Sequence, residues 1–510
     1  MEPTKEQKYN KELAKSNNIS KLDAIAGSGK TANLVMIAKE IVEPSLYLAF
    51  NKSMQVEADR KFPMHVTCKT VHGLAYSVIG KAYSHKLNRP RQYKNVAGTG
   101  NEISKFFKID DLILNKEGDY ISAPYLGLMV KDMVARFEQS GDQEINSDHF
   151  PVKYEKDLVG RYNSDVDMKK VKALVFSVAK KLWAARIDKD SPVLISHDTY
   201  LKLYQLSQPD LSANYKVIYV DESQDSNGVT LALVLSHKNK CKLVFVGDNR
   251  QAIYQWRGSV NAMNLIDCGV GSLTKSFRYG TELAEVATKI LGGKVQISGN
   301  EDIDTKVGAE NVLDYDKPYT ILYRTNSNMV SDALTEIKKG TKVKVSLDLR
   351  SLVSMLRSAE ALYQGEIHKV KDENVIPFTC WADFKTEGET NKELGRISKM
   401  VENNEVSRVI GIFSNYEQPT NPDVIMTTAH KSKGLEFDQV VLADDFPSNY
   451  DKEGTWRGLA EEEENLLYVS ATRAIERLQY NTTVQEILDL PCLTKIINKE
   501  AKVVDQIIGV

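Results

Sequence analysis

Short, almost wholly apolar segments that end in carboxylates restrict the fold of this chain more than any other feature. Residues 217–220 run directly into Asp221 and Glu222, and residues 243–246 lead to Asp248. A strand that is apolar at every position has both faces buried, which is typical of a parallel sheet covered by helices on both sides. These segments alternate with helical stretches, so the sequence predicts an α/β fold.

The same pattern returns late in the chain, where we predict strands at 319–324, 424–428 and 439–443 and a helix at 462–474. Two α/β domains, each interrupted by a mostly helical insertion, account for this repetition. Within the second insertion, 357–364 and 392–403 are predicted as exposed helices. The predicted boundaries are 1–89 and 191–273 for the first domain, 90–190 for its insertion, 274–345 and 421–510 for the second domain, and 346–420 for its smaller insertion.

Composition excludes several classes of protein. The 510 residues carry 67 Lys or Arg and 69 Asp or Glu, a net charge of −2, so any nucleic-acid contact requires a local basic surface. No apolar run approaches the roughly 18 residues of a membrane span. The residues at 1–18 are polar and charged and lack the apolar region of a secretory signal, so we expect no such signal. Five scattered cysteines without a CxxC pair indicate reduced thiols. We therefore expect no membrane association and a cytoplasmic chain, nuclear in a eukaryotic host.

Residues 24–31, AIAGSGKT, form a candidate phosphate-binding loop between a predicted strand and a predicted helix. Gly27, Ser28 and Gly29 would bring backbone N–H groups around phosphate oxygens at a helix N-terminus. Lys30 would reach the β- and γ-phosphates, and the Thr31 hydroxyl would bind Mg²⁺. The general pattern has glycine where this chain has alanine at position 24, and a glycine-rich turn can also be purely structural.

The strand that ends at Asp221 supplies the second half of such a site. Asp221 is placed to hold Mg²⁺, and Glu222 is placed to polarise the attacking water as general base. Carboxylates are common where strands end, but that alternative does not also explain the loop at 24–31. The sequence therefore predicts a core that hydrolyses a nucleoside triphosphate.

Five further segments occur in a fixed order: VGDNRQAIYQWRGS (246–259), SFRYG (276–280), ILYRTN (321–326), TTAHKSKGLEF (427–437) and EEENLLYVSATRA (462–474). With them the chain resembles the superfamily-one DNA helicases of the UvrD/Rep/PcrA type, over roughly two thirds of its length. The segments at 46–63, 66–76, 137–145 and 196–206 are more similar to the F-box DNA helicase branch. The resemblance implies two RecA-like P-loop domains. Gln7 lies so near the start that we expect no F-box before the motor.

The resemblance also implies roles at the nucleotide. Gln7 matches a glutamine that reads the adenine edge, although a solvated surface glutamine is the alternative. Phe277 matches an aromatic that stacks on the base, and Glu436 matches a contact to the sugar. Gln251 matches a glutamine that senses the γ-phosphate. The catalytic set that the resemblance implies is Lys30, Glu222 and Gln251, together with Arg278 and Arg473. The two arginines would reach across the cleft from the second domain, where their guanidinium groups could neutralise charge that develops on the transferred phosphoryl group.

Residues that match the DNA-contacting groove of such helicases divide between the two domains. Aromatic side chains suit the task because every base has a π face. Residues 60–94 hold eight Lys or Arg and no Asp or Glu, which favours a local phosphate-binding surface but also fits a solvated basic face. Tyr254 and Trp256 could equally be core residues. The matching residues are Phe50, Asn51, His72, Tyr254, Trp256 and Arg257 in the first domain and Arg324, Asn326, His430 and Lys433 in the second.

The leading prediction is an ATP- and Mg²⁺-dependent motor that moves 3′→5′ on single-stranded DNA and unwinds duplexes at single/double-strand junctions, in repair, recombination or replication. The short second insertion favours an alternative translocase that displaces proteins, with recombinase or single-strand-binding proteins as partners. A DNA-binding ATP switch ranks below both, because the catalytic set is complete. His65, Cys68 and His72 have zinc-like spacing but lack a fourth ligand nearby, so we expect no structural zinc.

Overall fold

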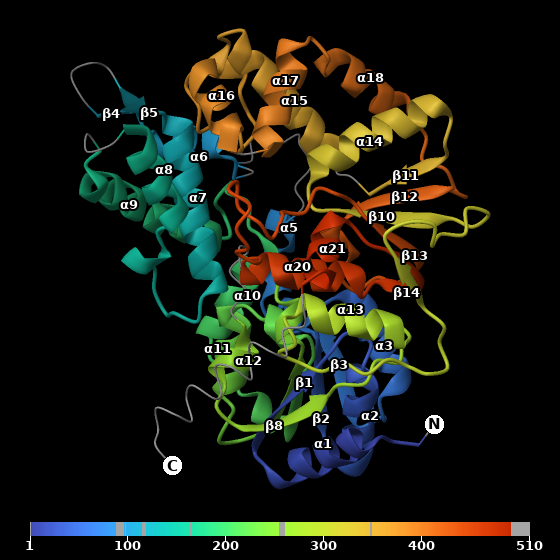
Figure 1. Ribbon diagram of the computed structural model, residues 1–510. Helices are drawn as coiled ribbons and strands as arrows, with labels where there is room; N and C mark the ends of the chain where they lie inside the picture. The colour runs from blue at the N-terminus through green and yellow to red at the C-terminus, as the bar shows by residue number, and fades with distance from the viewer. Residues whose placement is uncertain are drawn as a thin grey trace, which may run out of the picture.

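Two six-stranded parallel sheets form the framework of the protein (Figure 1). This computed structural model describes residues 2–87, 96, 98–114, 119–162, 166–253, 261–346, 349–390 and 392–490. Every pairing within the two sheets is parallel, so their carboxyl ends gather at one edge of each sheet. The predicted α/β class is confirmed.

The first sheet has the strand order β3-β2-β6-β7-β1-β8. Strands β2 and β6 are buried along their whole length, as expected for strands without a polar face. The glycine-rich loop follows β1, and the two adjacent carboxylates follow β6. The strands are β1 (Ile19–Ala24), β2 (Ser45–Ala49), β3 (Val66–Thr70), β6 (Val217–Val220), β7 (Lys242–Gly247) and β8 (Gly269–Leu273).

Helices cover both faces of this first sheet. The first of them begins with a capping box, in which Thr4 and Gln7 satisfy each other's backbone N–H groups. The next begins at Lys30, directly after the glycine-rich loop. These helices are α1 (Lys5–Ser16), α2 (Lys30–Glu40), α3 (Lys52–Lys61), α4 (Val71–Val78), α5 (Ser84–Leu87), α10 (His197–Leu206), α11 (Gly228–Leu235) and α12 (Ala262–Leu265).

The second sheet has the order β11-β12-β10-β13-β14-β9. Its strands are β9 (Lys306–Gly308), β10 (Tyr319–Tyr323), β11 (Val343–Val345), β12 (Val424–Thr428), β13 (Phe437–Leu442) and β14 (Ala474–Gln479), and its helices are α13 (Thr281–Ile290), α14 (Asn326–Lys339), α19 (Ala429–Ser432), α20 (Glu461–Ala471) and α21 (Thr482–Leu488). The helix predicted at 462–474 ends earlier, because residues from Ala474 onward pair with β13. The prediction was wrong at that end only.

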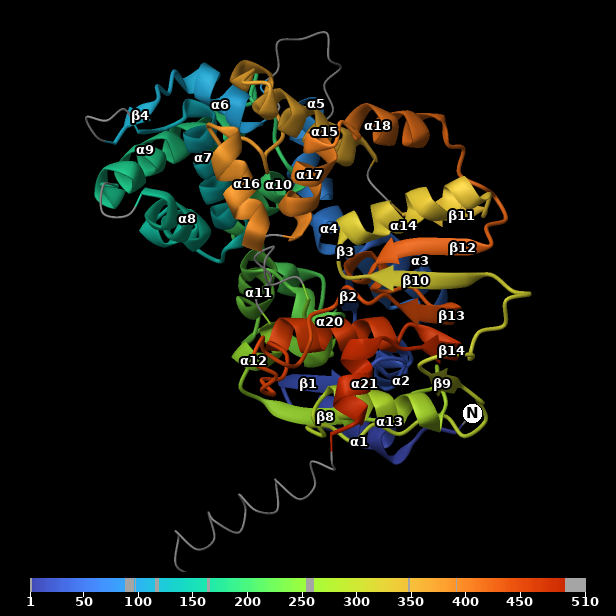
Figure 2. The same cartoon turned by 45° about the horizontal axis from the view of Figure 1, so that its top comes forward.

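The two insertions are mostly helical and lie side by side (Figures 1 and 2). An ion pair joins Lys131 to Glu373, and Asn101 Nδ2 donates to the Val370 carbonyl. The first insertion holds α6 (Gly100–Phe107), the hairpin β4 (Leu112–Ile113) and β5 (Tyr120–Ile121), α7 (Ala123–Gln139), α8 (Val152–Tyr162) and α9 (Met168–Ile187), and the second holds α15 (Leu349–Tyr363), α16 (Trp381–Thr390), α17 (Lys392–Glu402) and α18 (Val406–Asn415).

The prediction that 357–364 and 392–403 are exposed helices is wrong on exposure. Leu356 and Leu362 of α15 and Ile397 and Val401 of α17 are buried in a single hydrophobic cluster that also includes core residues of the first insertion. The charged residues of these helices cover only their outer faces. A helix of this kind has an apolar stripe that packs against a partner element.

Candidate active site

The glycine-rich loop has the backbone shape that a phosphate cradle requires. Gly27 and Gly29 have φ angles of +74° and +77°, in the left-handed region that favours glycine. A Cβ on Gly27 would lie 2.6 Å from Ser276 Oγ and 2.7 Å from the Cβ of Arg278. The Gly27 carbonyl accepts a hydrogen bond from the Phe277 N–H at 2.8 Å. The loop is therefore held against the segment at 276–278, where only glycine fits.

The predicted catalytic lysine and the two strand-end carboxylates meet beside this loop. Lys30 Nζ lies 3.0 Å from both carboxylate oxygens of Glu222. The Thr31 hydroxyl donates to Asp221 Oδ2 at 3.2 Å, and Tyr47 donates to the same oxygen at 2.6 Å. Elements far apart in sequence thus converge because the carboxyl ends of β1, β2 and β6 share one edge of the sheet.

Burial and neighbouring charges shift the pKa values of Glu222, Lys30 and Asp221. Burial opposes ionisation of Glu222, but Lys30 and Lys433 outweigh it and lower the carboxyl pKa to about 2. Burial also disfavours charge on Lys30, yet the carboxylates led by Glu222 raise its pKa above the ordinary value. For Asp221, burial and the neighbouring Glu222 charge raise the pKa. An ionised Glu222 at neutral pH is the state that a general base requires.

Gln251 lies at the same edge, after β7. Its Nε2 donates to Asp248 Oδ2 at 2.8 Å. Asp248 is fully buried and also accepts from Arg250 Nε at 2.6 Å, and Arg250 forms a two-pronged pair with Asp23 at the end of β1. The glutamine is thus fixed by a network that ties the ends of β1 and β7 together.

The two predicted arginines approach from the side of the second sheet. Arg278 donates to Glu436 Oε1 and to the Thr472 carbonyl, and its Cβ stands beside Gly27. Arg473 is 1% exposed, and it donates hydrogen bonds to the Val469 and Leu435 carbonyls and to the Thr472 hydroxyl. Burial, and then the nearby Arg278 charge, lower the pKa of Arg473 to about 10. A buried guanidinium held by neutral partners is an electrostatic site for anionic charge.

Gln7 and Phe277 flank the other side of the loop. A Cβ on Gly29 would lie 3.8 Å from Phe277 Cδ2 and 4.0 Å from Gln7 Nε2. Gln7 is 8% exposed, and its Oε1 accepts from the Thr4 N–H. The alternative of a solvated surface glutamine is therefore wrong. The pair borders the loop where a planar base could be held.

Three of the first-domain residues predicted to contact DNA are described, and two of them lie next to the catalytic edge. Phe50 and His72 line a small cavity together with Asp221 and Glu222. His72 Nε2 lies 3.0 Å from Asp198 Oδ1, and Phe50 is 48% exposed. Asn51 caps α3 by accepting from the Met54 N–H. Tyr254, Trp256 and Arg257 lie outside the described residues.

The second-domain residues predicted to contact DNA differ in accessibility. Arg324 forms a two-pronged ion pair with Glu463, while Asn326 is exposed at the start of α14 and His430 is half-buried in α19. The Lys433 side chain is only 8% exposed and lies 2.5 Å from Asp225 Oδ2. The structure thus places Lys433 between the two sheets rather than on an open surface.

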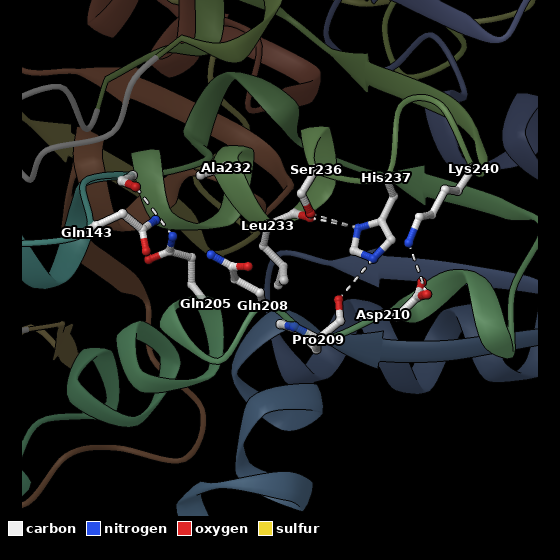
Figure 3. A pocket seen from close by; sticks show the side chains of 11 residues that line it. Gln143, Gln205, Gln208, Pro209, Asp210, Ala232, Leu233, Ser236, His237 and Lys240 are labelled. Atoms are coloured by element: carbon white, nitrogen blue, oxygen red, sulfur yellow. Dashed lines mark hydrogen bonds and ion pairs between the residues drawn. The ribbon is translucent and has the colours of Figure 1, made fainter.

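A larger cavity of about 320 Å³ lies elsewhere, between the ends of α10 and α11 (Figure 3). Its lining includes Gln143, Gln205 and Gln208, and Lys240 forms an ion pair with Asp210 at 3.0 Å. No predicted catalytic residue is among the residues that line it. The predicted site residues Asp221 and Glu222 line the smaller cavity instead.

Sequence reasoning missed four side chains that organise the site: Tyr47, Asp225, Asp248 and Tyr468. Asp248 and Tyr468 stand inside motifs already quoted, and Asp225 lies three residues after Glu222, so their signal was a position in or beside a motif. Each of the four contacts a predicted site residue or the phosphate loop. Tyr47 lies in an apolar strand, where a tyrosine is indistinguishable from a core residue.

A phosphate loop, a strand-end carboxylate pair and arginines beside a second parallel sheet define a P-loop nucleoside triphosphatase with two α/β domains. Family models place it further: the UvrD/REP helicase N-terminal domain matches residues 4–266, and the UvrD-like helicase C-terminal domain matches residues 141–485. The chain belongs to the UvrD/Rep helicase family, and the resemblance predicted from its motifs is confirmed.

Individual relatives agree with this assignment. The chain is 31% identical to F-box DNA helicase 1 of Gallus gallus over 92% of its length and 48% of that protein. It is 30% identical to F-box DNA helicase protein 1 of Schizosaccharomyces pombe over 93% of its length and 56% of that protein. Gabija protein GajB of Bacillus cereus is 24% identical over 54% of the chain. The chain thus spans about half the length of its F-box relatives.

Within the described ranges, no helix has both the length and the apolar character that crossing a bilayer requires.

Proposed function

We propose that this chain is an ATP-dependent DNA helicase that moves 3′→5′ along single-stranded DNA and unwinds duplexes in repair, recombination or replication. One observation carries the proposal. Lys30, Glu222 and Gln251 at the edge of one sheet face Arg278 and Arg473 from the side of the other. A catalytic set divided in this way makes ATP binding and domain closure interdependent, which is the physical requirement of a motor.

The chemistry follows from the groups present. Lys30 and the loop N–H groups would bind the phosphates, and the ionised Glu222 would take a proton from the attacking water. Arg278 and Arg473 would neutralise charge that develops on the transferred phosphoryl group. Gln7 and Phe277 would hold the adenine, and Glu436 the sugar.

The residues also fit a magnesium ion. The Thr31 hydroxyl and the Asp221 carboxylate offer hard oxygen donors 3.2 Å apart, as Mg²⁺ prefers. Bound there, the ion would neutralise phosphate charge. The role of this chain is to hold both oxygens in place, and the hydrogen bond from Tyr47 fixes the orientation of the Asp221 carboxylate.

The proposed DNA path is supported by the position of two predicted DNA contacts next to the catalytic carboxylates. Phe50 and His72 share a cavity with the catalytic carboxylates, so a strand held there would sense changes at the nucleotide. Phe50 would stack on bases, with Asn51, Arg324, Asn326 and His430 as further contacts and Tyr254, Trp256 and Arg257 as proposed contacts from the sequence. Lys433 would reach DNA only after its pairing with Asp225 opens.

A second candidate function is displacement of proteins, such as recombinase filaments or single-strand-binding proteins, by the same motor. The observation that favours it is the modest size of the second insertion, which consists of α15 to α18 and packs against the first insertion. The ATP-switch alternative ranks lower, because a switch with little turnover would have a damaged catalytic set and the sequence retains all of the predicted catalytic residues.

The test is strand displacement on matched substrates with a single-stranded tail at either the 3′ or the 5′ end, with ATP and Mg²⁺. The proposal expects release of the fluorescent strand from the 3′-tailed substrate only. Displacement of a recombinase filament without strand release would favour the second candidate. Release from the 5′-tailed substrate alone would contradict the proposed direction.

A further inference from the structure

Tyr468 reaches from a helix of the second domain into the phosphate loop of the first. It lies on α20, five residues before Arg473, and is fully buried. Its hydroxyl accepts a hydrogen bond from the Ala26 N–H at 3.0 Å and donates to Asp248 Oδ2 at 3.3 Å. One oxygen atom therefore bridges the loop, the end of β7 and α20.

The partner of this hydroxyl, Asp248, connects to both predicted reacting groups. Its Oδ2 also accepts from Gln251 Nε2, at 2.8 Å. Its backbone N–H donates to Gln224 Oε1 at 3.0 Å, and Gln224 Nε2 donates to Glu222 Oε2 at 2.6 Å. A shift of Asp248 would therefore move the glutamine and the general base together.

We propose that Tyr468 is a positioning residue that couples docking of α20 to the alignment of the phosphate loop and Gln251. When the second domain docks, its hydroxyl holds the Ala26 N–H and fixes Asp248, which in turn aims Gln251. When α20 moves away, the Ala26 N–H loses its acceptor and Asp248 loses a donor. Arg473 follows the same helix, so one movement of α20 would bring Arg473 toward the nucleotide and align the phosphate loop and Gln251.

Two features make the hydroxyl suited to this task. Burial raises the pKa of Tyr468 well above its ordinary value, so it remains a neutral donor at physiological pH. Asp248 is fully buried, and a hydrogen bond to a buried carboxylate is stronger than one between neutral groups. A second contact, from Asn465 Nδ2 to the Ala252 carbonyl at 3.4 Å, places α20 in register with the Gln251 segment.

The test is Tyr468→Phe, which removes one oxygen atom and retains the ring. This inference rests on the proposed ATPase, so the comparison is the rate of the variant relative to the unaltered chain. We expect kcat for ATP, with single-stranded DNA present, to fall about tenfold while KM changes less than about twofold. Tyr83→Phe is the matched control, because it removes a hydroxyl that donates to the Ile187 carbonyl at 2.8 Å, away from the site.

A double-mutant cycle separates positioning from a merely structural role. If Tyr468 acts through Gln251, adding Tyr468→Phe to a Gln251→Ala variant will lower kcat by less than about twofold. A full tenfold further loss, or a single Tyr468→Phe variant with unchanged kcat, would overturn the inference. Failure of the proposed function is distinguishable, because the unaltered chain would then show no stimulation by DNA.

Discussion

At the scale of single residues, Gly27 carries two separate constraints. Its φ of +74° strains any other residue, and an added Cβ would meet Ser276 and Arg278. Gly293 has a similar φ of +72°, but nothing lies within 4 Å of its Cβ position. The two glycines therefore allow backbone strain and crowding to be measured separately.

We predict that Gly293→Ala costs about 1–2 kcal/mol of stability, the usual cost of a left-handed alanine. Gly27→Ala should cost more, because a contact of 2.6 Å must also be relieved, and it should abolish ATP turnover by displacing the loop. Thermal unfolding and ATPase rates of both variants provide the check. Equal stabilities, with turnover intact in both, would contradict the crowding argument.

Asp225 provides a pH signature at the residue scale. Burial raises its pKa to about 6, although Lys433 opposes the shift. Protonation below about pH 6 would break the ion pair to Lys433 across the cleft, so we expect kcat to fall several-fold between pH 7 and pH 5. The Asp225→Asn variant should have a lowered kcat already at pH 7 and should not show this further fall of kcat at low pH.

The effect of Asp225 on stability has the opposite sign. Its pKa is higher in the folded chain than the ordinary value of 3.8, so the folded state binds the proton more tightly. The stabilisation is complete below about pH 4 and is lost as the pH rises through about 6. Asp210→Asn is the control: hydrogen bonds from Ser212 and then from Lys240 lower the pKa of this exposed carboxyl to about 2, so its variant should retain the fall in kcat at low pH. An unaltered fall in kcat at low pH in Asp225→Asn would contradict the assignment.

At the scale of elements, the contact between the insertions depends on Arg161 of α8. Its Nη1 donates to the Pro377 carbonyl at 2.8 Å, and its guanidinium lies 4.2 Å from the centre of the Phe378 ring. Arg161→Ala removes both interactions, so we expect faster backbone hydrogen exchange in 375–384 and in α8. Exchange in β1 should not change.

Lys156→Ala on the same helix is the control for that experiment, because Lys156 is exposed and its side chain forms no hydrogen bond or ion pair with the residues that the structure describes. Identical exchange in Arg161→Ala and the unaltered chain would show that the insertions are held together by other contacts.

Elements were predicted well where a strand is uniformly apolar. Strand β6 and its two carboxylates could be placed from sequence because that pattern has one structural explanation. The burial of α15 and α17 could not be predicted, since these helices pack against each other and against α14 and α18, in a cluster that also includes core residues of the distant first insertion. Tyr468 was missed for the same reason: a tyrosine among apolar residues of a helix has the pattern of a core residue until its partners in the other domain are known.

At the scale of the whole molecule, contacts across the cleft connect the two domains at the proposed catalytic site. Lys433 pairs with Asp225, Tyr468 bridges Ala26 and Asp248, and Arg278 stands beside Gly27. Among the described residues, neither domain alone supplies the whole of the proposed catalytic set. Hydrolysis must therefore depend on how the domains dock, which is the basis for expecting that DNA bound across both of them controls turnover.

Steady-state ATP hydrolysis with and without single-stranded DNA tests this central claim most directly. We predict a large stimulation by DNA that is lost in Glu222→Gln, with kcat lowered about 10²- to 10⁴-fold, and is retained in the control Glu12→Gln on the exposed side of α1. Turnover that is slow and indifferent to DNA, or unchanged in Glu222→Gln, would contradict the account.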